Sequence, residues 1–296
     1  MSAQRWLITG APGQLGSHVV RQLATEGRGV TILALARQPD VGTEGVAVRQ
    51  AELADLDALY AVVAEFRPTH VVHLAAMTAV GDCHRQPAVA ERVNIEATRV
   101  LAVAAAGARF VFSSTDMVFD GDAAPYGEAD LPRPLSHYGR TKAAAEQALA
   151  DIPNTLVLRI PLMYGFPCSR RQTTFAQQIA ALRAGQPLRL FSDEYRTPVW
   201  LADAARAVIG LARSGLTGVI HVSGPQRLSR YELIARCADL LGLPARHLVA
   251  ISRRDVAAAE PRPADLSLDG RRFAEAFPQL VPGPLHADAL AGESYT

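Results

Sequence analysis

The stretch WLITGAPGQLGSHVVRQLATEG, residues 6–27, decides the fold of this chain. Its first four residues, Trp6–Thr9, have the apolar character of a short buried strand, and Leu15–Glu26 has the spacing of an amphipathic helix. A glycine-rich turn at such a junction allows a tight bend and a close approach of the backbone to a pyrophosphate, and the helix N-terminus supplies N–H donors. The stretch therefore predicts a dinucleotide-binding loop that contains Gly10, Gly13 and Gly16.

The same alternation of short apolar runs and longer segments of helical period continues along the chain. It predicts an α/β fold, a Rossmann-type doubly wound parallel sheet with a small C-terminal substrate-binding lobe. Further strands are expected at Val30–Leu35, Val46–Arg49, Val71–Leu74, Arg109–Ser113 and Thr155–Arg159. Further helices are expected at Leu56–Glu65, Ala88–Ala106 and Tyr138–Leu149.

This pattern divides the chain into two parts. Residues 1–160 form the predicted dinucleotide-binding core, and residues 161–296 form mainly the substrate-binding lobe. After Pro161 the elements become shorter and less regular, which is too little material for an independent domain. One strand at about 219–222 and one helix at about 203–213 are expected to return to the core.

Composition narrows the class of protein and of partner. With 49% hydrophobic residues, 20% charged residues and a net charge of +1, the chain has the signature neither of disorder nor of a nucleic-acid-binding surface. Its three cysteines lie far apart and its eight histidines lack ligand spacing, so no disulfide framework or metal site is predicted. No signal peptide or membrane span is expected. These features favour a cytoplasmic protein with a small-molecule substrate.

The end of the second predicted strand bears on the choice of cofactor. An acidic residue there would bind the adenosine ribose hydroxyl of NAD, but in ILALARQPD, residues 32–40, no acid precedes Asp40. Arg37 stands instead where a cation would meet a 2′-phosphate. The sequence therefore predicts that NADP(H) is preferred over NAD(H).

A further signal is the distribution of cations. The chain has 30 Lys and Arg residues, and a single one of them, Lys142, is lysine. Lys142 follows Tyr138 by four residues in a predicted helix, so the two side chains share a face. An adjacent ammonium lowers the pKa of a phenol, and its remaining protons can bind a cofactor ribose, whereas a planar guanidinium is bulkier. Tyr138 is therefore a candidate acid–base group, with Lys142 as its partner.

Hydroxyl groups follow the strand at Arg109–Ser113. Ser113, Ser114 and Thr115 are expected at the carboxyl edge of the sheet, where doubly wound folds bind their ligands. A hydroxyl at that edge can hold a carbonyl oxygen for reduction. The glycine loop, these hydroxyls and the Tyr-x-x-x-Lys spacing follow one another along the chain, which favours a functional role for the hydroxyls over a simple strand end.

Together these motifs resemble the extended short-chain dehydrogenase/reductases. The resemblance extends along the whole chain and includes VVHLAAMTAV (71–80), VNIEATRVLA (93–102), YGRTK (138–142) and VLRIPLMYG (157–165). Within that family, STDMVFDG (114–121), RTPVWLADAARAV (196–208) and HVSGPQRLSRYELIARCADLLGL (221–243) are most similar to the dTDP-4-dehydrorhamnose reductase branch. They are also similar to the related regulatory β subunit of methionine adenosyltransferase.

The resemblance implies a role for each matching position. Thr115, with Ser114 as the alternative, would be the catalytic hydroxyl, Tyr138 the proton donor and Lys142 the group that binds the nicotinamide ribose. Besides Arg37, the cofactor would contact Gly10, Gly13, Gln14, Leu15, Gly16, Glu52, Leu53, Leu74, Ala75, Ala76, Tyr138, Lys142, Pro161 and Leu162. The substrate would contact Thr78, Val80, Ser114, Asp116, Met117 and Arg196, and a homodimer is expected.

Departures from the family pattern limit the reaction and the substrate. The branch usually has Tyr at Met117 and Asp at Glu52, so the identity of the sugar stays open. Dehydratases carry Glu after the Asp that follows the catalytic Thr, so dehydration is disfavoured here. Arg170, Arg171 and Arg196 follow the sixth strand, where basic side chains could bind a diphosphate.

The resulting expectation is an NADP-dependent oxidoreductase that reduces a carbonyl of a nucleotide-activated sugar. Two alternatives remain. A nucleotide-sugar epimerase would use the same three residues and keep its cofactor bound. A regulatory subunit would bind the dinucleotide and a protein partner without turnover.

Overall fold

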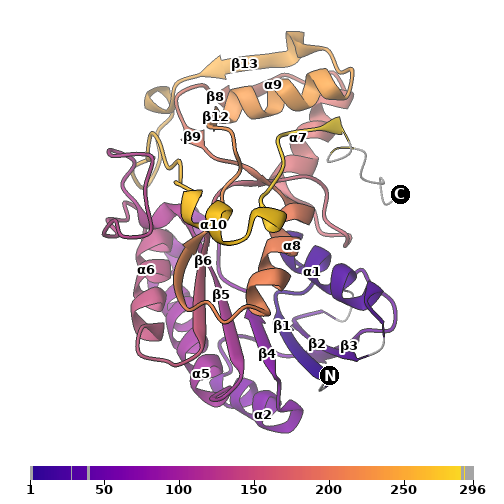
Figure 1. Ribbon diagram of the computed structural model, residues 1–296. Helices are drawn as coiled ribbons and strands as arrows, with labels where there is room; N and C mark the ends of the chain where they lie inside the picture. The colour runs from indigo at the N-terminus through magenta and orange to yellow at the C-terminus, as the bar shows by residue number, and fades with distance from the viewer. Residues whose placement is uncertain (1–2, 28, 39–40, 288–289, 291–296) are drawn as a thin grey trace.

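The computed structural model describes residues 3–27, 29–38, 41–287 and 290. Its centre is a seven-stranded parallel sheet in the order β11-β6-β5-β4-β1-β2-β3 (Figure 1). The strand order reverses between β1 and β4, so the edge beside these two strands is the topological switch point at which doubly wound sheets bind ligands. The predicted fold class is confirmed. The strands are β1 (Gln4–Thr9), β2 (Val30–Ala36), β3 (Ala47–Gln50), β4 (His70–His73), β5 (Arg109–Thr115), β6 (Thr155–Ile160) and β11 (Gly218–His221).

Helices cover both faces of the sheet (Figure 1). On one face, α1 (Gln14–Thr25) and α8 (Leu201–Ala212) bury a common apolar cluster against the central strands. On the other face, α2 (Leu56–Phe66), α5 (Ala97–Ala104) and α6 (His137–Leu149) do the same. Because both faces are covered, the central strands are almost continuously apolar, and every residue of β6 is buried.

The single helix expected at Ala88–Ala106 was wrong in detail. The chain forms α4 (Pro87–Glu91), then a π-helical turn, η1 (Arg92–Glu96), and only then α5. A short helix, α3 (Val80–Arg85), precedes them and was not foreseen. π turns are rare and frequently accompany functional sites. Apolar periodicity does not distinguish a π turn from an α-helix, because the extra residue changes the period over only one turn.

The C-terminal lobe is built around α7 (Thr174–Arg183), α9 (Arg230–Leu240) and a parallel pair of strands, β8 (Leu188–Phe191) and β13 (Leu248–Ile251). These elements lie at the top of Figure 1 and enclose their own apolar cluster. The sequence did not predict the strand pair. The shorter elements are η2 (Asp116–Val118), β7 (Met163–Tyr164), β9 (Tyr195–Arg196), β10 (Val199–Trp200), β12 (Leu228–Ser229), η3 (Ala245–His247), η4 (Arg253–Asp255), α10 (Arg271–Ala276) and η5 (Pro278–Leu280).

The last part of the chain returns from the lobe to the core. Backbone hydrogen bonds join Tyr126 N–H to the Ser267 carbonyl (2.9 Å) and Asp269 N–H to the Tyr126 carbonyl (2.7 Å). On the other side of this segment, the Leu266 N–H donates to the Tyr195 carbonyl at 3.0 Å. One extended segment therefore contacts both the core and the lobe, and it ties them together beside the carboxyl ends of β5 and β6.

Candidate active site

The glycine loop has the geometry that its sequence predicts. Gly10 adopts a φ of 67°, and a Cβ there would lie 2.8 Å from the backbone nitrogen of Ala75. A Cβ at Gly16 would overlap the Gly10 carbonyl oxygen. The N-cap of α1 is Gly13, and the first turn has no acidic side chain. The backbone N–H groups of that turn are therefore suited to bind an anion.

The ends of β1 and β4 are held together next to this loop. The Thr9 hydroxyl oxygen accepts hydrogen bonds from the backbone N–H groups of Leu74 (3.2 Å) and Ala75 (3.1 Å). Leu74, Ala75 and Ala76 are half-buried at the switch point. The other residues expected to contact a cofactor also lie just past strand ends: Gln14 and Leu15 after β1, exposed Glu52 and half-buried Leu53 after β3, and Pro161 and Leu162 after β6.

Arg37 follows β2 directly and is exposed. Its backbone carbonyl accepts a hydrogen bond from the side-chain amide of Gln50, at 3.3 Å, which holds the end of β2 against β3. Arg37 therefore lies one strand away from the glycine loop, at the carboxyl edge of the sheet. Asp40 lies outside the described residues.

Thr115 and Tyr138 are brought together by the packing of α6. Thr115 ends β5; its hydroxyl donates to Asp116 Oδ1 (3.0 Å) and accepts from Met117 N–H (3.2 Å). A Cβ at Gly139 would overlap the Met117 carbonyl oxygen, so α6 packs directly against the segment that follows Thr115. Tyr138, in the first turn of that helix, is half-buried at this contact.

The pKa of Tyr138 differs from the expectation. Burial raises the pKa of the phenol, the charge of Asp116 raises it further, and a hydrogen bond with Thr115 opposes the increase. The sequence argument considered only the ammonium four residues away and predicted a lowered pKa. It could not include burial or Asp116, which is distant from Tyr138 in the sequence.

Lys142 is almost completely buried, with 2% of its surface exposed. Its ammonium lies 3.9 Å from the centre of the Phe112 ring. Burial lowers the pKa of Lys142 to about 7, and the charge of Glu146 opposes that decrease. The buried His73 ring packs beside this site, and its ring nitrogens bond the hydroxyls of Thr9 (2.7 Å) and Thr98 (3.0 Å). Burial lowers the pKa of His73 to about 3.

Ser114, the alternative catalytic hydroxyl, belongs to a different buried network. Its hydroxyl donates to Glu146 Oε1. Glu146 also forms a buried ion pair with Arg159 of β6, with 2.7 Å between Nη2 and Oε2. Behind that pair, Arg159 Nη1 lies 3.3 Å from His221 Nε2. The Ser114 hydroxyl is therefore engaged by Glu146, whereas the Thr115 hydroxyl lies beside Tyr138.

Asn94, in the π turn, was not identified from the sequence. Its side-chain oxygen accepts from Met77 N–H at 2.8 Å, and its amide donates to the Met77 carbonyl (3.0 Å) and to the Thr141 hydroxyl (2.9 Å). Thr141 in turn donates to the Tyr138 carbonyl at 2.8 Å. Asn94 therefore fixes the helix that carries Tyr138 and Lys142 to the loop after β4. A lone Asn in a helical pattern carries no sequence signal for this role.

Charged side chains line the junction between the core and the lobe. Arg196 is 4% exposed, and its Nε lies 3.2 Å from Asp116 Oδ2. Burial raises the pKa of Asp116, and Arg196 opposes the increase. Arg230 and Arg262 approach Glu194 at 3.7 and 3.2 Å, and burial lowers the pKa of Arg230 to about 10. Of these residues, the sequence identified only Asp116 and Arg196.

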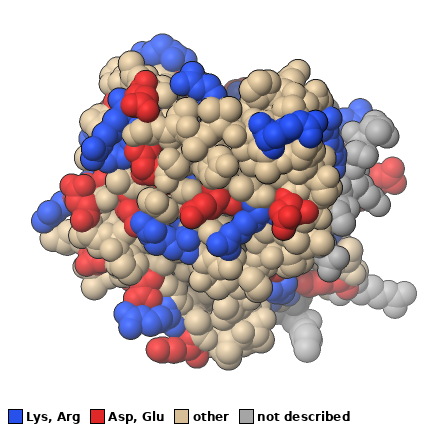
Figure 2. Space-filling model, turned by 90° about the horizontal axis from the view of Figure 1, so that it is seen from above, with Lys and Arg blue, Asp and Glu red and all other residues tan. Residues whose placement is uncertain are grey.

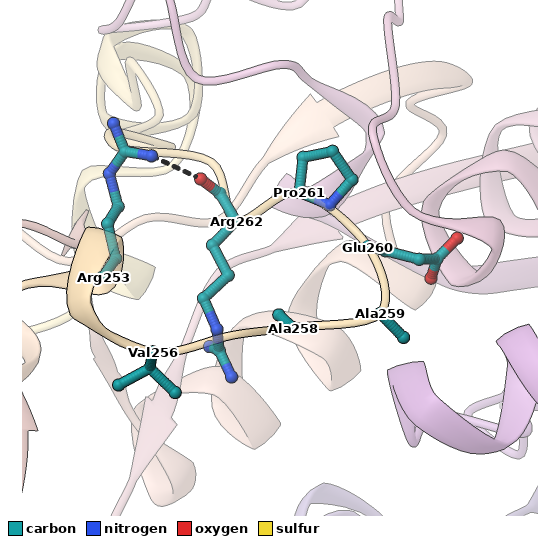
Figure 3. A pocket seen from close by; sticks show the side chains of 7 residues that line it. All are labelled: Arg253, Val256, Ala258, Ala259, Glu260, Pro261 and Arg262. Carbon is teal, nitrogen blue, oxygen red and sulfur yellow. Dashed lines mark hydrogen bonds between the residues drawn. The ribbon is translucent and has the colours of Figure 1, made fainter.

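A strap, residues 253–262, runs from β13 toward α6 and borders a cavity of about 420 Å³ (Figure 3). Arg253 donates to the Arg262 carbonyl at 2.9 Å. In Figure 3 the Arg262 side chain lies across the loop of the strap, whereas Glu260 extends out of it. Glu260 accepts from the backbone N–H of His137 at 2.7 Å and from Arg140 at 3.1 Å. The strap is thus attached to the N-terminus of α6, next to Tyr138.

The loop after β7 contains Arg170 and Arg171, and hydrogen bonds hold it next to the glycine loop. The N–H of Cys168 donates to the Ser17 hydroxyl at 3.0 Å, and the Ser169 hydroxyl donates to the Pro12 carbonyl at 2.8 Å. These bonds join the loop to the glycine loop and to the first turn of α1. Both arginines are exposed. The remaining predicted substrate contacts are exposed Thr78, half-buried Val80 and half-buried Met117.

The surface carries both signs of charge. Figure 2 shows basic and acidic side chains interspersed on the face that carries the C-terminal lobe. In the part of the chain that the structure describes, three or more potential metal ligands do not cluster at any point. None of the helices formed by those residues is long and apolar enough to cross a membrane.

The fold and the glycine loop are those of an extended short-chain dehydrogenase/reductase. Comparison with known proteins narrows this class. The family described as the RmlD substrate binding domain matches residues 4–283, and the chain belongs to that family.

Three similar proteins illustrate the family. A dTDP-4-keto-6-deoxy-D-glucose reductase of Streptomyces niveus is 31% identical over 265 residues, 88% of this chain and 86% of the relative. Methionine adenosyltransferase 2 subunit beta of Mus musculus is 31% identical over 285 residues, 90% of this chain and 80% of the relative. The crystal structure of a dTDP-4-dehydrorhamnose reductase of Bacillus anthracis, in complex with NADP, is 25% identical, covers 93% of each chain and has a TM-score of 0.82.

Proposed function

We propose that this protein reduces a carbonyl group of a nucleotide-activated sugar of the dTDP-4-keto-6-deoxy type, with NADPH as the preferred reductant. The observation that carries the proposal is the packing of Gly139 against Met117, which places Tyr138 beside Thr115 at the ligand-binding edge of the sheet. The similarity to a dTDP-4-keto-6-deoxy-D-glucose reductase supports the same substrate class.

Each residue of the candidate site has a separate role in the proposed reduction. The dinucleotide, when bound, supplies the hydride. The Thr115 hydroxyl holds the carbonyl oxygen, and Tyr138 gives that oxygen its proton. Because burial raises the pKa of Tyr138, the phenol carries this proton at neutral pH. The Lys142 ammonium binds the ribose of the cofactor.

Positive charge at the junction supports a diphosphate substrate. Among the residues that the structure describes, Arg196, Arg230 and Arg262 form ion pairs with only two carboxylates, those of Asp116 and Glu194. A diphosphate would supply the missing negative charge and would accept charge-assisted hydrogen bonds from these arginines, which are stronger than neutral hydrogen bonds. Exposed Arg37 supports NADPH as the reductant, as does the NADP held by the Bacillus anthracis reductase.

Activity and cofactor binding test the proposal together. NADPH and NADH are titrated by fluorescence, and dTDP-4-keto-6-deoxy sugars are then added while nicotinamide absorbance is followed. In Tyr138→Phe we expect kcat to fall by about 10²–10⁴ while NADPH affinity stays within about twofold, since general acid catalysis contributes a factor of that order. Tyr60→Phe, at an exposed tyrosine on α2, is the matched control and should be fully active. Full activity of Tyr138→Phe would contradict the proposal.

A second candidate is a regulatory role, favoured by the similarity to methionine adenosyltransferase 2 subunit beta. Tight dinucleotide binding with no oxidation by any keto-sugar would support it. A protein that purifies with bound nicotinamide and interconverts two sugars without net oxidation would instead be an epimerase.

We also propose that the protein acts in the cytoplasm as a homodimer. Its three cysteines are buried and unpaired, which fits a reducing compartment. Light scattering coupled to size exclusion measures the molar mass directly, and a value of 31.6 kDa would contradict the dimer.

A further inference from the structure

Lys142 lies in surroundings that are unfavourable for a charged group. It is 2% exposed, faces the Phe112 ring, and has no carboxylate within 4.0 Å among the described residues. An ammonium in such a place loses its hydration, which favours the neutral amine. The proposed function nevertheless requires Lys142 as a cation that binds the cofactor ribose. Some fixed charge must therefore offset the burial.

Glu146 is placed to supply that charge. It follows Lys142 by four residues in α6, so both side chains lie on the same helix face. Its carboxylate is held from the sheet, by the Ser114 hydroxyl of β5 and by Arg159 of β6, whose Nε and Nη2 lie 3.1 and 2.7 Å from its two oxygens. Because all these groups are buried, the carboxylate has a single fixed position.

The other titratable groups near Lys142 cannot replace Glu146. His73, on β4, is uncharged in its bonds to two hydroxyls, and a protonated His73 would repel the ammonium. Tyr138 precedes Lys142 by one turn of the same helix and carries its proton. Arg159, on β6, and His221 behind it carry no negative charge. Glu146 is the group whose charge raises the pKa of Lys142.

We propose that Glu146 is a positioning residue for Lys142: its anchored carboxylate keeps the buried Lys142 side chain charged and so sets the pH range in which the site works. With burial and Glu146 acting together, the pKa of Lys142 is about 7. A change in the neighbouring charge therefore alters the fraction of ammonium at neutral pH. An arginine at this position would remain charged whatever Glu146 did, so the charge depends on Glu146 only because the residue is a lysine.

The single lysine also makes the inference directly measurable. Protein grown with [ε-¹³C]lysine has one labelled side chain, Lys142, whose NMR signal reports its protonation. We expect the midpoint of this titration to lie at least about one pH unit lower in Glu146→Gln than in the wild type, since a buried charge partner shifts a pKa by one to three units. An equal or higher midpoint in Glu146→Gln would overturn the proposal.

Two further variants separate this effect from loss of structure. Glu146→Gln leaves Arg159 as an unpaired buried cation, which can prevent folding, whereas the double variant Glu146→Gln/Arg159→Met removes both charges. The double variant should also show a lowered midpoint, and an unchanged midpoint in it would count against the proposal. The matched control is Arg109→Met, at a buried cation that starts β5 at the opposite end of the sheet. It should reduce stability and leave the Lys142 midpoint unchanged.

The inference rests on the proposed function for its consequence in catalysis, and the two can fail separately. If both are right, the alkaline limb of the kcat/KM profile moves to lower pH in Glu146→Gln, by the same amount as the NMR midpoint. A shifted midpoint in a protein that reduces no keto-sugar supports the role of Glu146 and contradicts the function. Normal reduction with an unshifted midpoint contradicts the role of Glu146 and leaves the function intact.

Discussion

At the scale of single residues, the environment of a side chain decides its chemistry. Thr115 and Ser114 are neighbours with the same functional group, yet one lies beside Tyr138 and the other donates to Glu146. Lys142 and Tyr138 are both shifted by burial, in opposite directions, because burial always favours the neutral form. The proposed reduction uses the neutral phenol as its proton donor and the charged form of the amine as the group that binds the cofactor ribose.

Arg37 carries the residue-scale prediction. Arg37→Ala should weaken NADPH binding about tenfold and leave NADH binding nearly unchanged, because only the 2′-phosphate would lose a charge-assisted bond. The dissociation constants of both cofactors, measured by fluorescence at a fixed salt concentration, check this. Arg49→Ala removes another exposed arginine, on the adjacent strand β3, and should change neither constant. Equal losses of NADPH and NADH affinity in Arg37→Ala would show that Arg37 does not read the 2′-phosphate.

At the scale of secondary structure, α6 is the element on which the site depends. Three other segments fix it: η2 through the close contact at Gly139, the π turn through Asn94 and Thr141, and the strap through Glu260. Glu260 adds a carboxylate at the N-terminus of the helix, where the helix dipole favours negative charge. The position of Tyr138 is therefore determined by contacts from distant parts of the chain.

Gly139→Ala tests this dependence. The new Cβ would overlap the Met117 carbonyl and lie 2.9 Å from Pro134 Cβ, so α6 must move away from Thr115. We expect at least a tenfold loss of kcat and a loss of about 1–3 kcal/mol in stability, the usual cost of overpacking. Kinetics and denaturant unfolding measure the two effects. Gly215→Ala places a Cβ in open space and should change neither quantity. Wild-type kcat in Gly139→Ala would contradict the proposed role of this contact.

At the scale of the whole molecule, buried neutral histidines make the fold sensitive to acid. Burial lowers the pKa of His18 and of His221 to about 4, and that of His73 to about 3, from an ordinary value of 6.5. The unfolded chain therefore binds more protons than the folded chain below pH 6.5. Stability is fully present above that pH and is lost as the pH falls toward 4, by about 1.4 kcal/mol per pH unit for each histidine.

Denaturant unfolding between pH 7.5 and 5 measures this loss. The free energy of unfolding should fall steeply below pH 6.5, and His73→Gln should reduce the slope because one titrating group is removed. His247→Gln, at a partly exposed histidine, is the control and should keep the wild-type slope. The raised pKa of Asp116 acts in the opposite direction, but a single carboxyl cannot cancel three histidines. Constant stability from pH 7.5 to 5 would contradict the prediction.

The features that the sequence predicted correctly depend on local order along the chain. The glycine loop, the parallel strands and the four-residue spacing of Tyr138 and Lys142 all follow from period and spacing, and each lies in the expected kind of element. The π turn at Arg92–Glu96 and the pairing of β8 with β13 were missed. The first changes the helical period for a single turn, and the second joins strands that lie far apart in the sequence.

The fold class and the candidate acid–base residues could thus be predicted from the amino-acid sequence, because apolar periodicity and turn-forming residues act between residues that are close in the sequence. The charge states of the residues in the site could not be predicted in this way. The partners of Asp116 and Glu260 are contributed by segments that lie far from them in the sequence: Arg196 for Asp116, and His137 and Arg140 for Glu260. Burial, which sets the pKa of Tyr138 and of Lys142, is a property of the assembled molecule. The sequence identifies the groups that can react, and the packing of the folded chain determines which of them are charged.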